Sequence, residues 1–298
     1  MTLPTLKAQP RMRFFDATSV RQYSTGLSLA LAAPLIVLLT FAFLYPVGKL
    51  LWTSFATQTG YTAEHYLRIL YEPIYLKILW RTLRIAFLVT VASFLLGYPV
   101  AYAMNLIRNR WGLLIIACVL IPLWTSVLVR SYAWIVLLQR NGVINDLLLH
   151  GGLIDAHLRM IYTEGAVIVA MVHVLLPFMI LPIFSSLKSI PDDLARAASN
   201  LGAGVVQTFV SVTLPLSLPG VFAGSLMTFI LALGFYITPA LLGGPSTLMM
   251  ATIIGQQTTE SLNWPFAGAL SGVLLGVTLL LVIVFRRVLS FNREVQLG

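Results

Sequence analysis

Long apolar runs alternate with shorter polar segments along most of the chain. Six runs, at 27–51, 83–104, 112–138, 166–186, 219–242 and 267–288, are long enough to cross a membrane, which takes about 20 apolar residues in a helix. Lipid offers the backbone no hydrogen-bond partners, and the runs lack the strict alternation of barrel strands, so they predict helices. The first run is longer than the apolar part of a cleavable signal peptide. We therefore expect an all-α integral membrane protein with six transmembrane helices.

Composition supports this class and argues against others. Hydrophobic residues make up 58% of the 298 positions and charged residues 10%, with a mean hydropathy of +0.90, whereas about a quarter of the residues in a soluble domain are charged. The net charge of +9 comes from cations in the tails and between apolar runs, so nucleic-acid binding is not expected. The single cysteine, Cys118, excludes an intrachain disulfide and a cysteine metal cluster.

The positive charges predict the orientation of the helices. With the N-terminus inside, 11 of the 19 Lys and Arg residues fall on the cytoplasmic side: Lys7, Arg11, Arg13, Arg21, Arg108, Arg110, Lys188, Arg196, Arg286, Arg287 and Arg293. Cytoplasmic loops carry an excess of such cations. Both termini are therefore predicted to be cytoplasmic, with tails at 1–26 and 289–298. The segments 52–80, 139–165 and 243–266 are then the outer loops.

The segment 187–218, between the fourth and fifth runs, carries helix signals in a cytoplasmic position. Ser189 to Asp192 read as a capping box, and Asp192 and Asp193 suit the positive end of a helix dipole. We expect one helix over 190–200 that ends near Gly202 in a left-handed conformation. A second helix over 205–213, with Val205, Phe209 and Val212 on one face, is expected to stop at Pro215 before Pro219 opens the fifth span.

The alanines in this segment have two possible explanations. Their small side chains could let another surface approach the helix backbone closely, or they could simply favour a helix. Their spacing resembles the EAA signature of permease subunits in ATP-binding cassette importers: Ala197 and Ala198, three residues, Gly202, nine residues, then Val212, Thr213, Leu214 and Pro215. The usual glutamate is replaced by Arg196. Asp192 or Asp193 could supply the acid, or Arg196 could pair with Asp193 one turn earlier.

The resemblance covers about 77–288 and implies the type I importer permease fold. It implies that the 187–218 loop contacts an ATPase through Asp192, Asp193, Arg196, Ala197, Ala198, Gly202, Leu214 and Pro215. It also implies three kinds of partner: two cytoplasmic ATPase subunits, a second, related permease subunit and an extracytoplasmic binding protein. No G-x-x-x-x-G-K-[ST] loop occurs, so this chain is expected to be no enzyme and to hold no cofactor, with ATP and Mg bound by the ATPase.

Two further stretches look like the permeases of spermidine and putrescine importers. They are "PLWTSVLVRSYAW" at 122–134 and "LGFYITPALLGGPSTLMMATIIGQQ" at 233–257. The resemblance implies a multi-pass protein of the bacterial inner membrane that carries a polyamine or a related cationic or zwitterionic solute.

Ionisable and aromatic residues within the spans are candidates for the translocation path. Arg130, Tyr132, Trp134, His173 and Tyr236 form this set. Charged groups in spans usually mark function, but Arg130 could also snorkel to the interface, His173 could be a packed core histidine, and the aromatics could be interface anchors. The predicted spans contain no Asp or Glu, so substrate choice is expected to belong mainly to the separate binding protein.

Two other functional classes are weaker. An ion-coupled secondary transporter is favoured by acids within spans and by inverted repeats, and neither is evident in the sequence. A membrane enzyme needs clustered catalytic groups, whereas His65, His150, His157 and His173 are scattered along the chain.

Overall fold

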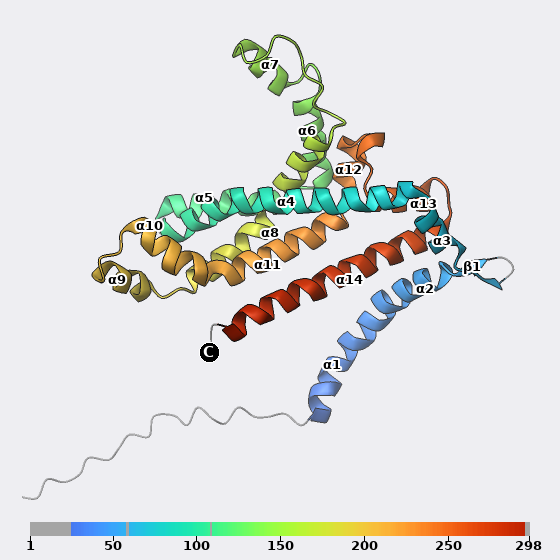
Figure 1. Cartoon of the computed structure of the whole chain (residues 1–298), viewed down its shortest axis with the longest axis horizontal. Helices are drawn as coiled ribbons and strands as arrows, with labels where there is room; N and C mark the ends of the chain where they lie inside the picture. Colours follow the sequence, from blue (N-terminus) through green and yellow to red (C-terminus); the bar gives the residue numbers. More distant parts are fainter. Residues whose placement is uncertain (1–24, 58–59, 108, 296–298) are drawn as a thin grey trace, which may run out of the picture. The chain divides into compact units, whose positions relative to one another are not determined.

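The computed structural model describes residues 25–57, 60–107 and 109–295. The cations predicted for the N-terminal tail, and Arg108, lie outside these residues, as does most of the predicted tail 1–26. The chain forms two compact units, Met1–Lys49 and Leu50–Gly298. Figure 1 shows the helices that make up each unit.

The first unit is a single apolar helix that continues a few residues past Lys49. α1 (Thr25–Leu39) passes through a π-helical turn, η1 (Thr40–Leu44), into α2 (Tyr45–Thr53). Its stretch Leu29–Thr53 has a mean hydropathy of 2.2 and none of it is buried. The predicted first span coincides with this helix.

The centre of the second unit is formed by three long helices that lie side by side, α4 (Pro73–Leu106), α8 (Glu164–Lys188) and α11 (Leu214–Leu233) (Figure 1). Glycines bring the backbones close together, as is common between membrane helices. A Cβ atom on Gly220 would lie 2.6 Å from the carbonyl oxygen of Pro182, and one on Gly224 would lie 2.9 Å from that of Met179. Larger side chains at these two positions would force α8 and α11 apart.

Buried hydroxyl groups add hydrogen bonds between the helices. The Tyr98 hydroxyl on α4 lies 2.9 Å from Ser217 Oγ on α11. Thr82 Oγ1 on α4 accepts the backbone N–H of Met250 at 2.9 Å. Met250 begins α13 (Met250–Thr259), so this bond joins α4 to an element 168 residues away in sequence. These bonds satisfy polar groups that would be costly to bury alone.

The predicted third span, 112–138, is not one helix. α5 (Arg110–Trp124) and the segment Val127–His150 after it are bent by 102°. Pro122 lies in the last turn of α5, and the backbone of Thr125 is extended, with its hydroxyl donating to the Pro122 carbonyl at 2.8 Å. A proline in a helix weakens the turn around it, and here the helix ends two residues later, at Trp124. α6 (Val127–Leu138) and α7 (Val143–His150) then lead away from the central helices (Figure 1).

The predicted fifth span, 219–242, is also corrected. A helix begins at Val205 as α10 (Val205–Thr208), passes through a π-helical turn, η2 (Phe209–Thr213), and continues as α11 to Leu233. Pro215 therefore does not stop the second loop helix. The Leu214 N–H bonds to the Phe209 carbonyl, five residues back, and this wider turn accommodates the proline ring. Residues 234–236 break the helix before α12 (Ile237–Leu242).

The predicted outer loops contain short elements. The first has the strands β1 (Ala56–Thr57) and β2 (Gly60–Tyr61), followed by α3 (Glu64–Tyr71). The third contains a short 3-10 helix, η3 (Pro245–Thr247), and α13. Arg68 on α3 donates to Glu72 at 2.9 Å, which raises the pKa of the arginine, and its guanidinium lies 4.7 Å from the centre of the Phe266 ring. Phe266 belongs to α14 (Trp264–Val295), so this cation–π contact joins α3 to the last helix.

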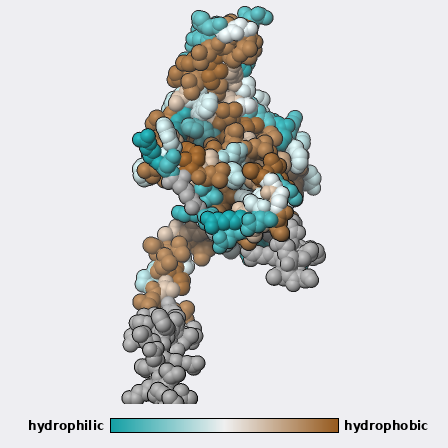
Figure 2. Space-filling model, turned by 90° about the vertical axis from the view of Figure 1, so that its left-hand side faces the viewer, coloured by the Kyte–Doolittle hydropathy of each residue, from teal (hydrophilic) through white to brown (hydrophobic). Residues whose placement is uncertain are grey.

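The expectation of an all-helical membrane protein is confirmed. Five helices in the described chain are long and apolar enough to span a membrane, or six if the bent pair counts as one span. Hydrophobic residues also cover much of the surface seen in Figure 2, including the protruding region of α6 and α7. The orientation of the termini stays a prediction.

Candidate functional site

The turn before α9 (Asp192–Asn200) differs from the predicted capping box. Ser189 ends α8, and its hydroxyl donates to the Ser186 carbonyl at 2.7 Å. Pro191 precedes α9 and provides no side-chain cap. The Ser189 hydroxyl, which was expected to cap the N-terminus of α9, thus bonds the C-terminal end of α8 instead. α9 begins at Asp192, two residues later than predicted.

The charged residues of α9 are exposed to solvent. Asp192 and Asp193 lie in its first turn, as expected. Arg196 Nη1 lies 3.7 Å from Asp193 Oδ1, with the two side chains 76% and 89% exposed. Exposed pairs of this kind contribute little to stability. Arg196 therefore meets an acid of its own helix, which is one of the alternatives considered from the sequence.

The end of α9 has the geometry predicted at Gly202. This residue has φ of +84°, the left-handed conformation that glycine adopts without a side-chain clash. Its N–H donates to the Ser199 carbonyl at 3.0 Å, and the Ala203 N–H donates to the Ala198 carbonyl at 3.0 Å. These two bonds form a Schellman motif, which satisfies carbonyls at the helix end. The chain reverses here and leads into α10.

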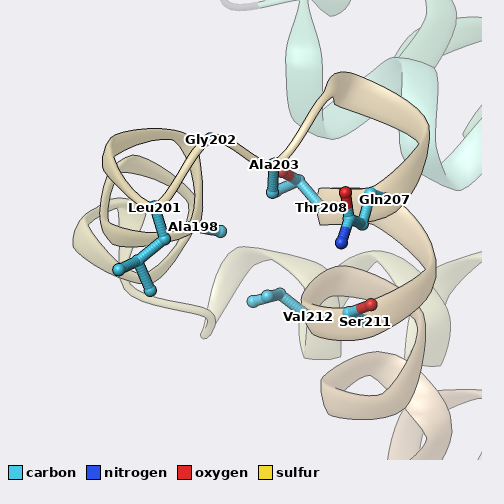
Figure 3. A pocket seen from close by; sticks show the side chains of 8 residues that line it. All are labelled: Ala198, Leu201, Gly202, Ala203, Gln207, Thr208, Ser211 and Val212. Carbon is cyan, nitrogen blue, oxygen red and sulfur yellow. The ribbon is translucent and has the colours of Figure 1, made fainter.

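A pocket of about 230 Å³ lies between α9 and the α10–η2 segment (Figure 3). Ala198 and Val212 point toward each other across it, and the Thr208 hydroxyl beside it is buried without a partner among the described residues. The pocket is lined by Ala198, Leu201, Gly202, Ala203, Gln207, Thr208, Ser211 and Val212. Three positions of the EAA-like spacing, 198, 202 and 212, are thus brought together. Leu214 and Pro215 lie at the start of α11 and do not line it.

Exposed apolar side chains surround this turn, and sequence reasoning missed them. Leu201, Val205 and Val206 are 89%, 84% and 76% exposed. The helical periodicity placed Val205 on one face with Phe209 and Val212, but it did not predict that Val205 is exposed. The signal available in the sequence was the pair of adjacent valines directly after Gly204, which cannot both face the same side of a helix.

Phe209, in contrast, anchors the segment to α4. Its ring lies 6.0 Å from that of Tyr98 and 5.3 Å from that of Tyr102, edge to face in both cases. Tyr98 also bonds Ser217 of α11. The loop helix is therefore attached to two of the central helices, α4 through aromatic contacts and α11 through the continuous backbone.

Three of the five candidate path residues lie together where α6 meets α8. The Trp134 indole N–H donates to His173 Nδ1 at 3.0 Å. Arg130 lies one turn before Trp134 on α6, and its Nε and Nη1 are buried with no partner in the described chain. Tyr132 is 57% exposed and lies on another side of α6. The Tyr236 ring packs against α13, where a Cβ atom on Gly255 would lie 2.4 Å from it.

No group of three or more His, Cys, Asp or Glu residues in the described parts of the chain could hold a metal ion. An ion pair occurs at the N-terminal end of α8, where Glu164 bonds Arg84 of α4. This contact joins two central helices.

A family model described as "Binding-protein-dependent transport system inner membrane component" matches residues 85–292. The Haemophilus influenzae protein named spermidine/putrescine transport system permease protein PotB is 36% identical, over 87% of this chain and 93% of its own length. The Escherichia coli protein of the same name is 34% identical, over 87% and 97%.

Solved structures have the same fold. A bacterial alginate ABC transporter, in complex with an alginate-bound periplasmic protein, includes a chain with a TM-score of 0.72 and 19% identity, covering 87% of this chain and 92% of that one. A chain of the MetNI methionine ABC transporter in an inward-facing conformation has a TM-score of 0.59 and 20% identity, covering 74% and 97%.

Proposed function

Because the chain belongs to the family of binding-protein-dependent transport system inner membrane components, we propose that its substrate is a polyamine. It is a permease subunit of an ABC importer in the bacterial inner membrane, and the ATPase is a separate subunit. The proposed substrate rests on the sequence identity of 34–36% to two proteins named spermidine/putrescine permeases, over 87% of this chain in both cases. Family membership favours this function over an ion-coupled secondary transporter.

The proposed complex contains two ATPase subunits in the cytoplasm, a second related permease subunit and an extracytoplasmic binding protein. ATP and Mg are held by the ATPase in this proposal. Both termini and the 187–218 loop then lie on the cytoplasmic side, in agreement with the distribution of cations in the sequence.

We assign the contact with the ATPase to α9, the Gly202 turn and α10. Three observations support this assignment. Leu201, Val205 and Val206 present apolar surface to solvent, which marks a protein interaction site more often than a lone exposed residue does. The pocket beside them has room for a partner side chain. The α10 helix continues into α11, so a displacement of the contact is transmitted to a central helix.

The proposed path lies beside α6, α8 and α12 and includes Arg130, Tyr132, Trp134, His173 and Tyr236. Its support is the contact of Trp134 with His173 and the exposure of Tyr132 and Tyr236, which are 57% and 44% exposed. Aromatic faces attract cations, and amines are cationic at neutral pH.

The test is transport by the reconstituted complex. The chain is purified with its partner permease and ATPase, placed in liposomes, and supplied with binding protein and labelled spermidine. ATP supplied on the side of the ATPase subunits should drive uptake. A complex whose ATPase variant cannot hydrolyse ATP should show no uptake. Uptake that runs on an ion gradient without ATP would contradict the mechanism, and ATP-driven uptake of another solute in preference to spermidine would contradict the substrate.

A further inference from the structure

A second cavity, of about 480 Å³, opens at the end of the long helices from which α9 extends. It lies between the ends of α4 and α8 and the starts of α5 and α9, on the same side of the second unit (Figure 1). Because α4 and α8 are long and apolar enough to span a membrane, their ends lie near the lipid headgroups. The volume of the cavity is within the range of ligand-binding pockets, about 300–1,000 Å³.

The lining of this cavity is apolar inside and polar at its mouth. A side chain at Gly112 would collide with the carbonyl of Ile107, so the turn from α4 to α5 forms a closely packed wall. The apolar lining residues that are buried or half-buried are Met104, Ile107, Ile116, Phe184 and Ile190. The polar lining residues that are exposed are Asn109, Lys188 and Asp192.

Lys188 gives the mouth an accessible positive charge. Its ammonium lies 6.0 Å from the centre of the Phe184 ring, and no acid of the described chain forms an ion pair with it. Asn109 accepts the Trp111 N–H at 3.0 Å through Oδ1, so its amide nitrogen remains a donor. Asp192 also lines the cavity and has an interaction partner of its own. An accessible ammonium and an amide donor therefore share one cavity.

An ammonium and an amide match a phosphate group, which accepts charge-assisted hydrogen bonds. The apolar lining indicates which phosphate compound fits. Leu113, which also lines the cavity, is 70% exposed, and the neighbouring Trp111 is 58% exposed, as is common for tryptophan at a membrane surface. A soluble anion would leave this apolar lining uncovered, whereas the glycerol and first methylene groups of a lipid would cover it. Basic pockets between membrane helices bind anionic headgroups in this way.

We propose that this cavity binds an anionic phospholipid of the adjacent leaflet through its headgroup phosphate. The bound headgroup contacts the segment that leads into α9, because Ile190 precedes this helix and Asp192 begins it. The lipid is thus part of the support of the loop that we assign to the ATPase contact. Its binding depends neither on that assignment nor on the transported solute.

The experiment measures the affinity of phosphatidylglycerol for the full complex, by native mass spectrometry in detergent over a titration of the lipid. Lys188→Gln removes the charge and Lys188→Arg keeps it. Lys77→Gln is the matched control, because Lys77 is an exposed lysine near the other end of α4. Leu113→Trp places an indole at the mouth of the cavity. Its control is Leu114→Trp, because Leu114 is 52% exposed and does not line the cavity.

Lys188→Gln should weaken the affinity about fivefold, the effect of one cation near an anionic lipid surface. Lys188→Arg and Lys77→Gln should stay near the wild-type affinity. Leu113→Trp should also weaken binding, and Leu114→Trp should not.

Three results would overturn the proposal. The first is equal affinity of Lys188→Gln and the wild type. The second is a loss in Lys188→Gln that Leu113→Trp does not share, because the lipid would then be attracted to surface charge alone. The third is a wild-type complex that binds no phosphatidylglycerol, because a partner subunit would then fill the cavity. Displacement of the lipid by an equal concentration of inorganic phosphate would assign the cavity to a soluble anion and would also overturn the proposal.

Discussion

Replacement of Gly202 by alanine isolates the role of the turn between α9 and α10. Gly202 has φ of +84°, and a Cβ atom built on it would meet nothing within 4 Å. The substitution therefore creates no clash, and its cost comes from the backbone conformation alone. Gly204 is the matched control, because it also has open space around its Cα but has φ of −73°, which any residue adopts.

The left-handed conformation costs a residue with a side chain about 1–2 kcal/mol relative to glycine. A difference of this size lowers the population of the native turn by about 5- to 30-fold relative to alternatives of similar energy. Gly202 is exposed and lies outside the contacts between the central helices, so the protein should still insert and assemble. Asparagine tolerates the left-handed conformation better than alanine does, so Gly202→Asn should have a smaller effect.

The assay is ATP hydrolysis stimulated by the loaded binding protein, measured together with spermidine uptake in liposomes. Gly202→Ala should lower both by about 5- to 30-fold, Gly202→Asn should lower them less, and Gly204→Ala should leave them near the wild-type level. Gly202→Asp adds a charge to the strained backbone and should abolish uptake while insertion continues. Equal activity of Gly202→Ala and Gly204→Ala would refute the reasoning, because the two differ only in the backbone conformation that is required.

Three other substitutions test the transmission path and the packing. Phe209→Ala removes two aromatic contacts with α4, each contributing about 0.5–1.5 kcal/mol. ATP hydrolysis should persist in this variant while uptake per ATP falls. Val210→Ala changes an exposed residue and should leave both hydrolysis and uptake per ATP at the wild-type level. Gly224→Val places side-chain atoms against α8 and should lower the melting temperature in detergent, whereas Gly276→Val, with open space around it, should not; equal melting temperatures would contradict the close packing. Thr82→Val leaves a buried N–H of α13 without an acceptor and should cost about 1–3 kcal/mol, measured as a shift in the denaturant midpoint; an unchanged midpoint would show that the bond adds no stability.

The sequence was informative where one residue type answers one physical requirement. Apolar length predicted helices because lipid forces backbone groups to pair within a segment. Gly202 was predicted correctly because a helix that reverses direction needs a residue with positive φ. The local ion pair of Arg196 with Asp193 was one of the alternatives, since residues three apart on a helix are neighbours.

Hydropathy does not record where a helix breaks or widens, and the predictions failed at such points. The run 112–138 is apolar on both sides of the bend at Thr125 and Ser126, so its average hydropathy still predicts one span. Pro215 was taken as a stop, although a π-helical turn before a proline leaves room for its ring. Ser189 could cap either of two helices, and only the structure decides between them.

The candidate path was predicted in part. Arg130, Trp134 and His173 were singled out as rare polar or aromatic groups in spans. The hydrogen bond between Trp134 and His173, however, joins α6 to α8 across 39 positions of sequence. No local pattern predicts such a pairing. Tyr132 lies two residues from Arg130 and from Trp134, so helical spacing alone places it on another side of α6.

The unbroken helix from Val205 to Leu233 gives the loop a mechanical role. Its 29 residues extend roughly 40 Å at about 1.5 Å per residue. The middle of this rod is held by the glycine contacts of Gly220 and Gly224 with α8. Because the helix is continuous, a displacement of its Val205 end is carried along the same helix toward Leu233.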